Sequence, residues 1–147
     1  FQPVEQLREA GVPVAVATGR TDDVLAAADV AVTASGTATV QAAIHGCPMV
    51  IVYRLSALTY RLVKWFVHVD NVGMVNLIAG KQIVPELLQE ALTPDTVSAE
   101  VVRYLTKSTL ARDTTAALAE VRGKLGTEGA SRRTAERVLA IARQQTT

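Results

Sequence analysis

The stretch from Val30 to Tyr53, VAVTASGTATVQAAIHGCPMVIVY, decides the fold. Two short apolar runs rich in β-branched residues, Val30–Ala34 and Met49–Tyr53, flank a segment that predicts a helix, Ala38–His45, ending at Gly46. Runs of this kind are typical of parallel strands that are buried on both faces. Because the connections are short, the succession strand–helix–strand predicts a right-handed crossover. The stretch therefore indicates an α/β protein with a parallel sheet.

The same rhythm extends toward the N-terminus. Residues 4–10, VEQLREA, predict the end of an amphipathic helix that Gly11 terminates. Val12–Ala17, VPVAVA, predicts a further buried parallel strand. A short helix from Thr21 to Ala28 follows, with Thr21 as its predicted N-cap.

Helices dominate the prediction after Tyr53. Ser56 is a candidate N-cap for a helix over Ala57–Val67, and Ile83–Glu86 predicts a short extended piece before a helical turn at Glu86–Glu90. Thr93-Pro94 is a strong helix start. Breaks at residues 108–109 and 126–129 divide the remaining chain into three predicted helices.

Composition excludes several classes of protein. With 147 residues, 49% hydrophobic and 20% charged, the chain predicts a packed core rather than a disordered segment. Lys and Arg (15) nearly balance Asp and Glu (14), so no nucleic-acid partner is expected. The single cysteine fits a reducing compartment, and the longest apolar run is too short to span a bilayer. The chain opens on Phe1 without a signal peptide, and we expect a fragment of a longer protein.

The candidate site centres on the turn between the first strand and helix of the stretch quoted above. The carboxyl edge of a parallel sheet is where α/β proteins bind ligands, glycine allows close approach, and the first turn of a helix attracts phosphate. Its candidate binding residues are Ser35, Gly36, Thr37 and Ala38. The alternative is a tight turn with Ser35 as an N-cap. The sequence here is neither Gly-x-Gly-x-x-Gly nor a Walker loop.

Further polar residues join this candidate site. Gln41, in the same predicted helix, is placed to reach a sugar hydroxyl, or is an ordinary surface residue. Asn76 lies among apolar residues, so it needs partners, in a ligand or in a braced loop. Tyr53 and Arg54 end a predicted strand, where Arg54 either meets a diphosphate or caps a neighbouring helix. Glu86 and Gln89 lie three apart on one face of a predicted short helix and contact either a ligand or solvent.

A basic and aromatic segment follows the third strand. Arg61, Lys64, Trp65 and Phe66 suit a membrane surface, because basic side chains meet anionic head groups and tryptophan favours the interface. A helix that faces the core would carry the same aromatic residues. His45 and His68 are far apart and no cluster has the spacing of metal ligands, so no metal is expected. No Gly-x-Ser-x-Gly elbow supports triad chemistry.

Five sequence motifs, in order along the chain, closely resemble those of the lipid-A-disaccharide synthase family: SGTAT at 35–39, GCPMV at 46–50 with Tyr53-Arg54, LT at 58–59, NLIAG at 76–80 and PELLQ at 85–89. The resemblance implies a glycosyltransferase of the GT-B fold and its Rossmann-like C-terminal domain. It implies transfer of 2,3-diacylglucosamine from UDP to 2,3-diacylglucosamine 1-phosphate (lipid X), giving a β-1,6 disaccharide and UDP with inversion and without metal or other cofactor. It also implies a cytoplasmic enzyme, peripheral on the inner membrane of a Gram-negative bacterium.

The resemblance assigns roles to the candidate residues. The turn at Gly36–Thr37 would stabilise the charge that grows on UDP, and Arg54 would hold the donor end. Gln41 would orient the ribose, although the family usually carries glutamate there, and Asn76 would position the donor. The acceptor's base would lie outside this chain.

The resemblance also predicts the domain organisation. Residues 1–126 would form an incomplete Rossmann-like UDP-binding domain that lacks its opening strand, and residues 127–147 a helix that packs toward a missing N-terminal domain. We expect this chain alone to be inactive and prone to self-association. Two alternatives stay open: another UDP-sugar enzyme of this fold, such as a cell-wall glycosyltransferase or an epimerase, and a non-catalytic nucleotide-binding or assembly module.

Overall fold

A computed structural model describes residues 2–55, 71–126 and 129–144. Its sheet has three parallel strands in the order β1 (Ala31–Ala34), β2 (Met49–Tyr53) and β3 (Glu86–Leu88). Helix α3 (Thr37–Ile44) connects β1 to β2, as the strand–helix–strand pattern predicts. The prediction of an α/β fold with a parallel sheet is therefore confirmed.

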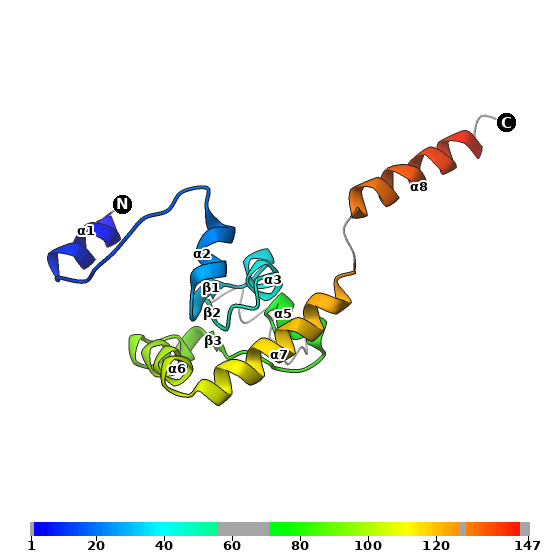
Figure 1. Ribbon diagram of the computed structural model, residues 1–147. Helices are drawn as coiled ribbons and strands as arrows, with labels where there is room; N and C mark the ends of the chain where they lie inside the picture. The colour runs from blue at the N-terminus through cyan, green and yellow to red at the C-terminus, as the bar shows by residue number, and fades with distance from the viewer. Residues whose placement is uncertain (1, 56–70, 127–128, 145–147) are drawn as a thin grey trace.

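Of the remaining described helices, α1 and α8 lie away from the sheet and the others lie close to it (Figure 1). Their bounds are α1 Gln2–Glu9, α2 Thr21–Ala27, α5 Met74–Ala79, the 3-10 helix η1 Gln89–Ala91, α6 Pro94–Thr106, α7 Ser108–Lys124 and α8 Ala130–Gln144. The three C-terminal helices confirm the predicted division. The predicted helix over 57–67, with its candidate membrane residues, lies outside the described residues.

The core lies between the sheet and helices α3, α5 and α7. Met49 and Ile51 of β2 are fully buried and pack in one cluster with Val75 of α5 and Leu118 of α7. Val50 is also fully buried, and it points to the opposite face of the sheet because successive side chains of a strand alternate. Helix α6 also contacts β2. Burial of Met49, Val50 and Ile51 on both faces of the sheet explains the continuous run of apolar residues in β2.

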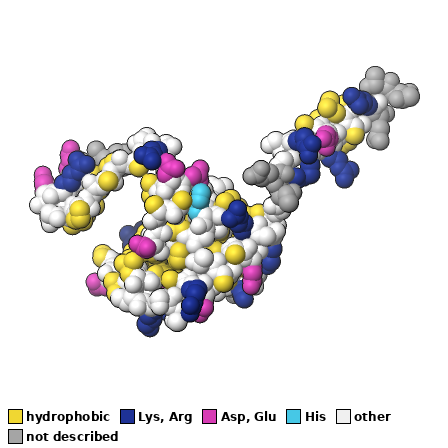
Figure 2. Space-filling model, in the orientation of Figure 1, with side chains coloured by type: hydrophobic (Ala, Val, Ile, Leu, Met, Phe, Trp, Pro, Cys, Tyr) yellow, Lys and Arg dark blue, Asp and Glu magenta, His cyan; other side chains and the backbone are white. Residues whose placement is uncertain are grey.

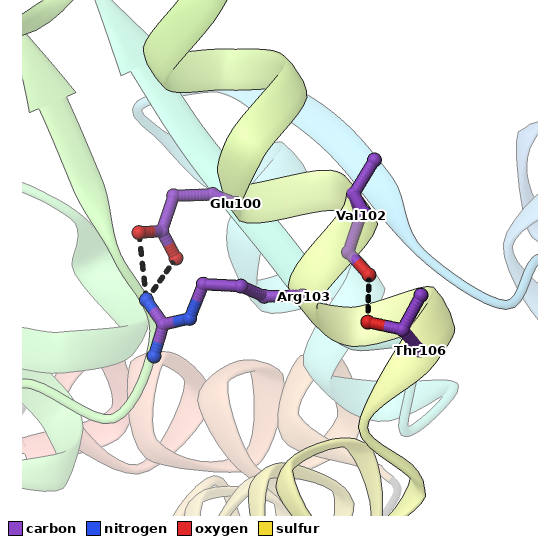
Figure 3. Close-up of polar contacts among 4 residues, drawn as sticks. All are labelled: Glu100, Val102, Arg103 and Thr106. Atoms are coloured by element: carbon purple, nitrogen blue, oxygen red, sulfur yellow. Dashed lines mark hydrogen bonds and ion pairs between the residues drawn. The ribbon is translucent and has the colours of Figure 1, made fainter.

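Helix α6 begins as the sequence predicts. Oγ1 of Thr93 accepts a hydrogen bond from the backbone N–H of Thr96 (3.2 Å), and Oγ1 of Thr96 accepts one from the N–H of Thr93 (3.1 Å). This reciprocal capping box satisfies two helix-end donors. Farther along the helix, Nη1 of Arg103 donates to both carboxylate oxygens of Glu100 at 2.7 Å (Figure 3).

The predicted strand at Val12–Ala17 is wrong. The structure has no strand there, and the chain runs between α1 and α2 away from the sheet (Figure 1). Val12 and Val16 remain 45% and 63% exposed. An apolar run becomes a parallel strand only when a neighbour takes its backbone hydrogen bonds, and among the described residues β1 is paired with β2 alone. The β1 edge is therefore open.

Two local predictions also need correction. Residues 86–88 form a strand rather than a helical turn, because Leu87 and Leu88 pair with Val52 and Tyr53 of β2. The N-cap of α2 is Arg20 rather than Thr21, and it makes no side-chain capping bond.

Helices α1 and α8 project away from the body of the molecule (Figure 1). On α8, Val138, Leu139 and Ile141 are all more than half exposed, and basic side chains lie along the same helix (Figure 2). No helix among the described residues is long and apolar enough to cross a membrane.

Candidate functional site

The turn at Gly36 lies at the carboxyl end of β1, where the sequence places the candidate site. Gly36 is the N-cap of α3 with φ +125° and ψ −155°, a backbone conformation that side chains other than hydrogen rarely permit. It provides no side-chain cap. Because the first N–H groups of a helix have no intrahelical acceptor, α3 presents donors and the positive end of its dipole here.

Ser35 does not cap this helix, so the alternative interpretation of the turn is wrong on that point. Its Oγ donates instead to the backbone oxygen of Val72, at 3.1 Å. Thr39 does not cap it either: this residue is fully buried, and its Oγ1 donates back to the oxygen of Gly36 at 2.8 Å rather than accepting from an N–H group. Thr37 and Ala38 are exposed at the start of the helix.

Asn76 is the most completely bonded of the candidate residues. It is fully buried, its Nδ2 donates to the oxygen of Val84 (2.9 Å) and to Oε1 of Glu86 (2.7 Å), and its Oδ1 accepts from two backbone N–H groups. Those donors belong to Ile83 (2.9 Å) and Val84 (3.1 Å). The amide thus donates two hydrogen bonds and accepts two, all within the protein, as expected if Asn76 braces a loop.

Glu86 completes this corner. Its Oε2 accepts from the N–H of Val72 (2.8 Å) and its Oε1 from the N–H of Gly73 (2.9 Å), at the start of α5. These N–H groups immediately precede the helix, so Glu86 does not cap α5, but a carboxylate at this end complements the helix dipole. Since Ser35 also binds Val72, the structure joins three candidates, Ser35, Glu86 and Asn76, in one network.

Tyr53, Arg54 and Gln89 lie together at the carboxyl ends of β2 and β3. Tyr53 is 37% exposed, Nη2 of exposed Arg54 contacts the oxygen of Leu92 at 3.5 Å, and Nε2 of Gln89 donates to the oxygen of Leu55 at 3.4 Å. Gln89 has φ +51°, a left-handed conformation that is uncommon outside glycine. All three stand at the edge where the sequence predicts ligand binding.

Gln41 points toward α2 and shares one acceptor with His45. Nε2 of Gln41 and Nε2 of His45 each lie 2.9 Å from Oδ1 of Asp22. These hydrogen bonds, the one from His45 first and then that from Gln41, lower the pKa of the Asp22 carboxyl.

Sequence reasoning missed two residues of this arrangement, Asp22 and His45. The spacing of Gln41 and His45, four residues apart, places both side chains on one face of α3 and was the available signal. Nothing in the sequence identifies Asp22 as their common acceptor, because that contact depends on how α2 packs against α3.

The other hollows and clusters lie away from this edge. A hollow of about 230 Å³ opens at the amino end of β3, lined by Gln82, Ile83, Val84, Pro85, Glu100, Arg103, Tyr104 and Leu110. Burial raises the pKa of Tyr104 there and that of the Cys47 thiol in the core. Within the described part of the chain, no three His, Cys, Asp or Glu side chains are grouped to hold a metal ion.

The parallel sheet and its helices place this chain among the α/β proteins. Proteins of this class generally bind ligands at the carboxyl edge of the sheet, where the open glycine turn lies. A family model described as lipid-A-disaccharide synthetase matches residues 1–141. The chain therefore belongs to the lipid-A-disaccharide synthetase family, as its resemblance predicts.

Curated relatives agree with this assignment. The lipid-A-disaccharide synthase of Geobacter sulfurreducens is 42% identical over 139 residues, which are 95% of this chain and 36% of that protein. That of Anaeromyxobacter dehalogenans strain 2CP-C is 45% identical over 125 residues, 85% of this chain and 33% of its own length. The chain thus spans about a third of the length of these relatives.

Proposed function

We propose that this chain is the donor-nucleotide-binding part of a lipid-A-disaccharide synthase. The whole enzyme would transfer 2,3-diacylglucosamine from UDP to 2,3-diacylglucosamine 1-phosphate, with inversion, giving the β-1,6 disaccharide and UDP. The observation that carries this proposal is the family match over residues 1–141, which includes the open turn at Gly36. The relatives that it resembles are named for this activity.

The turn would bind the diphosphate. The first N–H groups of α3 can donate to phosphate oxygens and stabilise negative charge as it grows on the leaving UDP, which needs no metal ion. Exposed Arg54, near the same edge, would add a positive charge, and Tyr53 and Gln89 would contact the donor. Gln41 would orient the ribose, and the base for the acceptor hydroxyl would come from the rest of the enzyme.

Asn76 and Glu86 would act as positioning residues. Asn76 donates to Glu86, Glu86 holds the N–H groups of Val72 and Gly73, and the oxygen of Val72 accepts the hydrogen bond of Ser35 beside the turn. In the full-length synthase, Asn76→Ala is expected to lower activity by at least about tenfold, because small displacements of reacting groups have large effects on rate. Unchanged kinetics would remove Asn76 from the site.

The lipid substrates suggest where the enzyme acts. We propose that it is peripheral on the cytoplasmic leaflet of the inner membrane and that Arg61, Lys64, Trp65 and Phe66 contact the lipid surface. The exposed apolar residues of α8 would be covered by the remainder of the longer protein, and in isolation they would favour self-association.

Amide NMR of this chain, titrated separately with UDP and with uridine, tests the nucleotide site. We expect saturable shifts at Gly36, Thr37 and Ala38 with UDP and much weaker ones with uridine, which lacks the phosphates. Dispersed spectra that ignore UDP would contradict the donor-site assignment and favour a non-catalytic assembly module. In the full-length protein, preference for a non-lipid acceptor would favour another UDP-sugar transferase.

A further inference from the structure

One carboxylate joins two helices beside the proposed nucleotide site. Oδ1 of Asp22, in the first turn of α2, accepts hydrogen bonds from Gln41 and His45 of α3, both at 2.9 Å. The Asp22 side chain is 68% exposed, whereas that of His45 is 24% exposed. Asp22 is thus a solvent-facing acceptor that reaches across to α3.

This contact decides which end of the Gln41 amide is free. An ionised carboxylate only accepts hydrogen bonds, so the amide atom that faces Asp22 must be the NH₂ group. The lowered pKa of Asp22 keeps the carboxylate ionised at neutral pH. Oε1 of Gln41 is therefore the outer end of the amide, and no described residue donates a hydrogen bond to it.

The position of Gln41 fits contact with a sugar. It follows Gly36 by five residues, so the helical rise places it roughly 7 Å along α3 from the turn. Gln41 is partly exposed, and its free oxygen is an acceptor. Sugar hydroxyls donate well to such an acceptor, and carboxylate oxygens serve the same purpose in dinucleotide-binding folds.

We propose that Asp22 is a positioning residue that holds the Gln41 amide with Oε1 toward the ribose hydroxyls of the bound nucleotide. This inference rests on the proposed function, since it requires UDP to bind at the Gly36 turn. It assigns to α2 a role in ribose selection that its own sequence does not signal. Asp22 acts through Gln41, and contact between Asp22 and the nucleotide is not required.

Asp22→Asn separates positioning from simple packing. Asparagine has nearly the same shape but can also donate, so the Gln41 amide is free to rotate and present its NH₂ group instead. The double variant Asp22→Asn/Gln41→Glu restores a fixed acceptor, because the introduced asparagine amide can donate to a glutamate that has only acceptor oxygens. A loss in the single variant with recovery in the double variant is specific to orientation.

The measurement is calorimetric binding of UDP and of 2′,3′-dideoxy-UDP to this chain. We expect wild type to prefer UDP by about fivefold or more, as one or two hydrogen bonds provide. The preference falls to less than about twofold in Asp22→Asn and recovers in the double variant. His45→Ala, which removes the other partner of Asp22, leaves the preference unchanged and controls for a loosened contact between α2 and α3.

Two results would overturn the inference in different ways. If wild type binds UDP with a clear preference over the dideoxy analogue and Asp22→Asn keeps that preference, Asp22 only links two helices, while the proposed function survives. If wild type does not bind UDP, or binds both nucleotides equally, there is no ribose contact at Gln41 for Asp22 to position. Absence of UDP binding would also reject the donor site itself.

Discussion

The turn at Gly36 and the corner around Asn76 are joined through Ser35 and Val72, yet they differ in whether their polar groups are hydrogen-bonded. Helix α3 begins without a side-chain cap, so the turn leaves backbone donors available. At the corner, every hydrogen-bonding position of the Asn76 amide is occupied, and Glu86 accepts hydrogen bonds from the N–H groups of Val72 and Gly73 just before α5. From this difference we infer that the fully hydrogen-bonded corner holds the turn in place, while the backbone donors of the turn stay available for a ligand.

Removing the Asn76 amide should have the largest effect on folding. Asn76→Ala leaves two backbone N–H groups and the oxygen of Val84 without their buried partner. We expect the free energy of unfolding to fall by about 3–4 kcal/mol, measured by urea denaturation. Gln82→Ala, an exposed neighbour outside this network, should change it by less than about 0.5 kcal/mol. A loss below about 1 kcal/mol for Asn76→Ala would mean that the corner does not hold the fold.

Gly73 tests how closely the corner is packed. A Cβ at this position would overlap Cδ1 of buried Ile51 and lie 3.0 Å from Oε1 of Glu86. We therefore expect Gly73→Ala to reduce stability by about 2 kcal/mol, as overpacking does. Ile51→Val removes the overlapping methyl group, so in that background the same change should cost less than about 1 kcal/mol. Equal costs in the two backgrounds would exclude the close approach to Ile51 as the cause.

A substitution at Gly36 tests the turn whose backbone donors are available. Nothing lies within 4 Å of a Cβ at Gly36, so Gly36→Ala is strained only through its φ of +125°. We expect a loss of about 1–2 kcal/mol in stability, together with weaker UDP binding, because the N–H groups of the turn must move. Gly80, at the end of α5, also has a positive φ (+77°) and open space. Gly80→Ala should therefore lower stability without changing UDP affinity; an equal effect on affinity would show that the turn has no special role.

The parts of this fold that the sequence predicts are those whose causes are local. Met49–Tyr53 reads as a buried strand because all its residues are apolar, and Thr93-Pro94 contains both helix-start signals. Val12–Ala17 has the same apolar pattern as Met49–Tyr53 but no sheet neighbour, so the strand that the pattern predicts there does not form. At 86–88 the pairing with β2 overrides a plausible helical turn.

The candidate site divides in the same way. The open turn follows from a serine, a glycine and a strand end that are adjacent in sequence. From the sequence, Asn76 indicates only that a buried amide needs hydrogen-bond partners. Those partners, Val84 and Glu86, can be identified only when β3 is placed beside β2. The acceptor of Gln41 lies 19 residues away on another helix, and no short-range pattern encodes such a contact.

The smallest effect concerns the titration of Asp22, at the margin of the open turn. Its folded pKa lies below the ordinary value of about 3.9, so its hydrogen bonds contribute stability above that pH, and this contribution is lost as pH falls through the folded pKa. Because Asp22 is exposed, the effect on global stability is slight, and carboxyl-carbon NMR is the suitable measurement. His45→Ala should raise the pKa of Asp22 toward the ordinary value, and Gln41→Leu should raise it less, since the His45 bond is the larger cause. The opposite order would make Gln41 the dominant partner, and an unshifted pKa in wild type would mean that α2 is not held against α3 through this carboxylate.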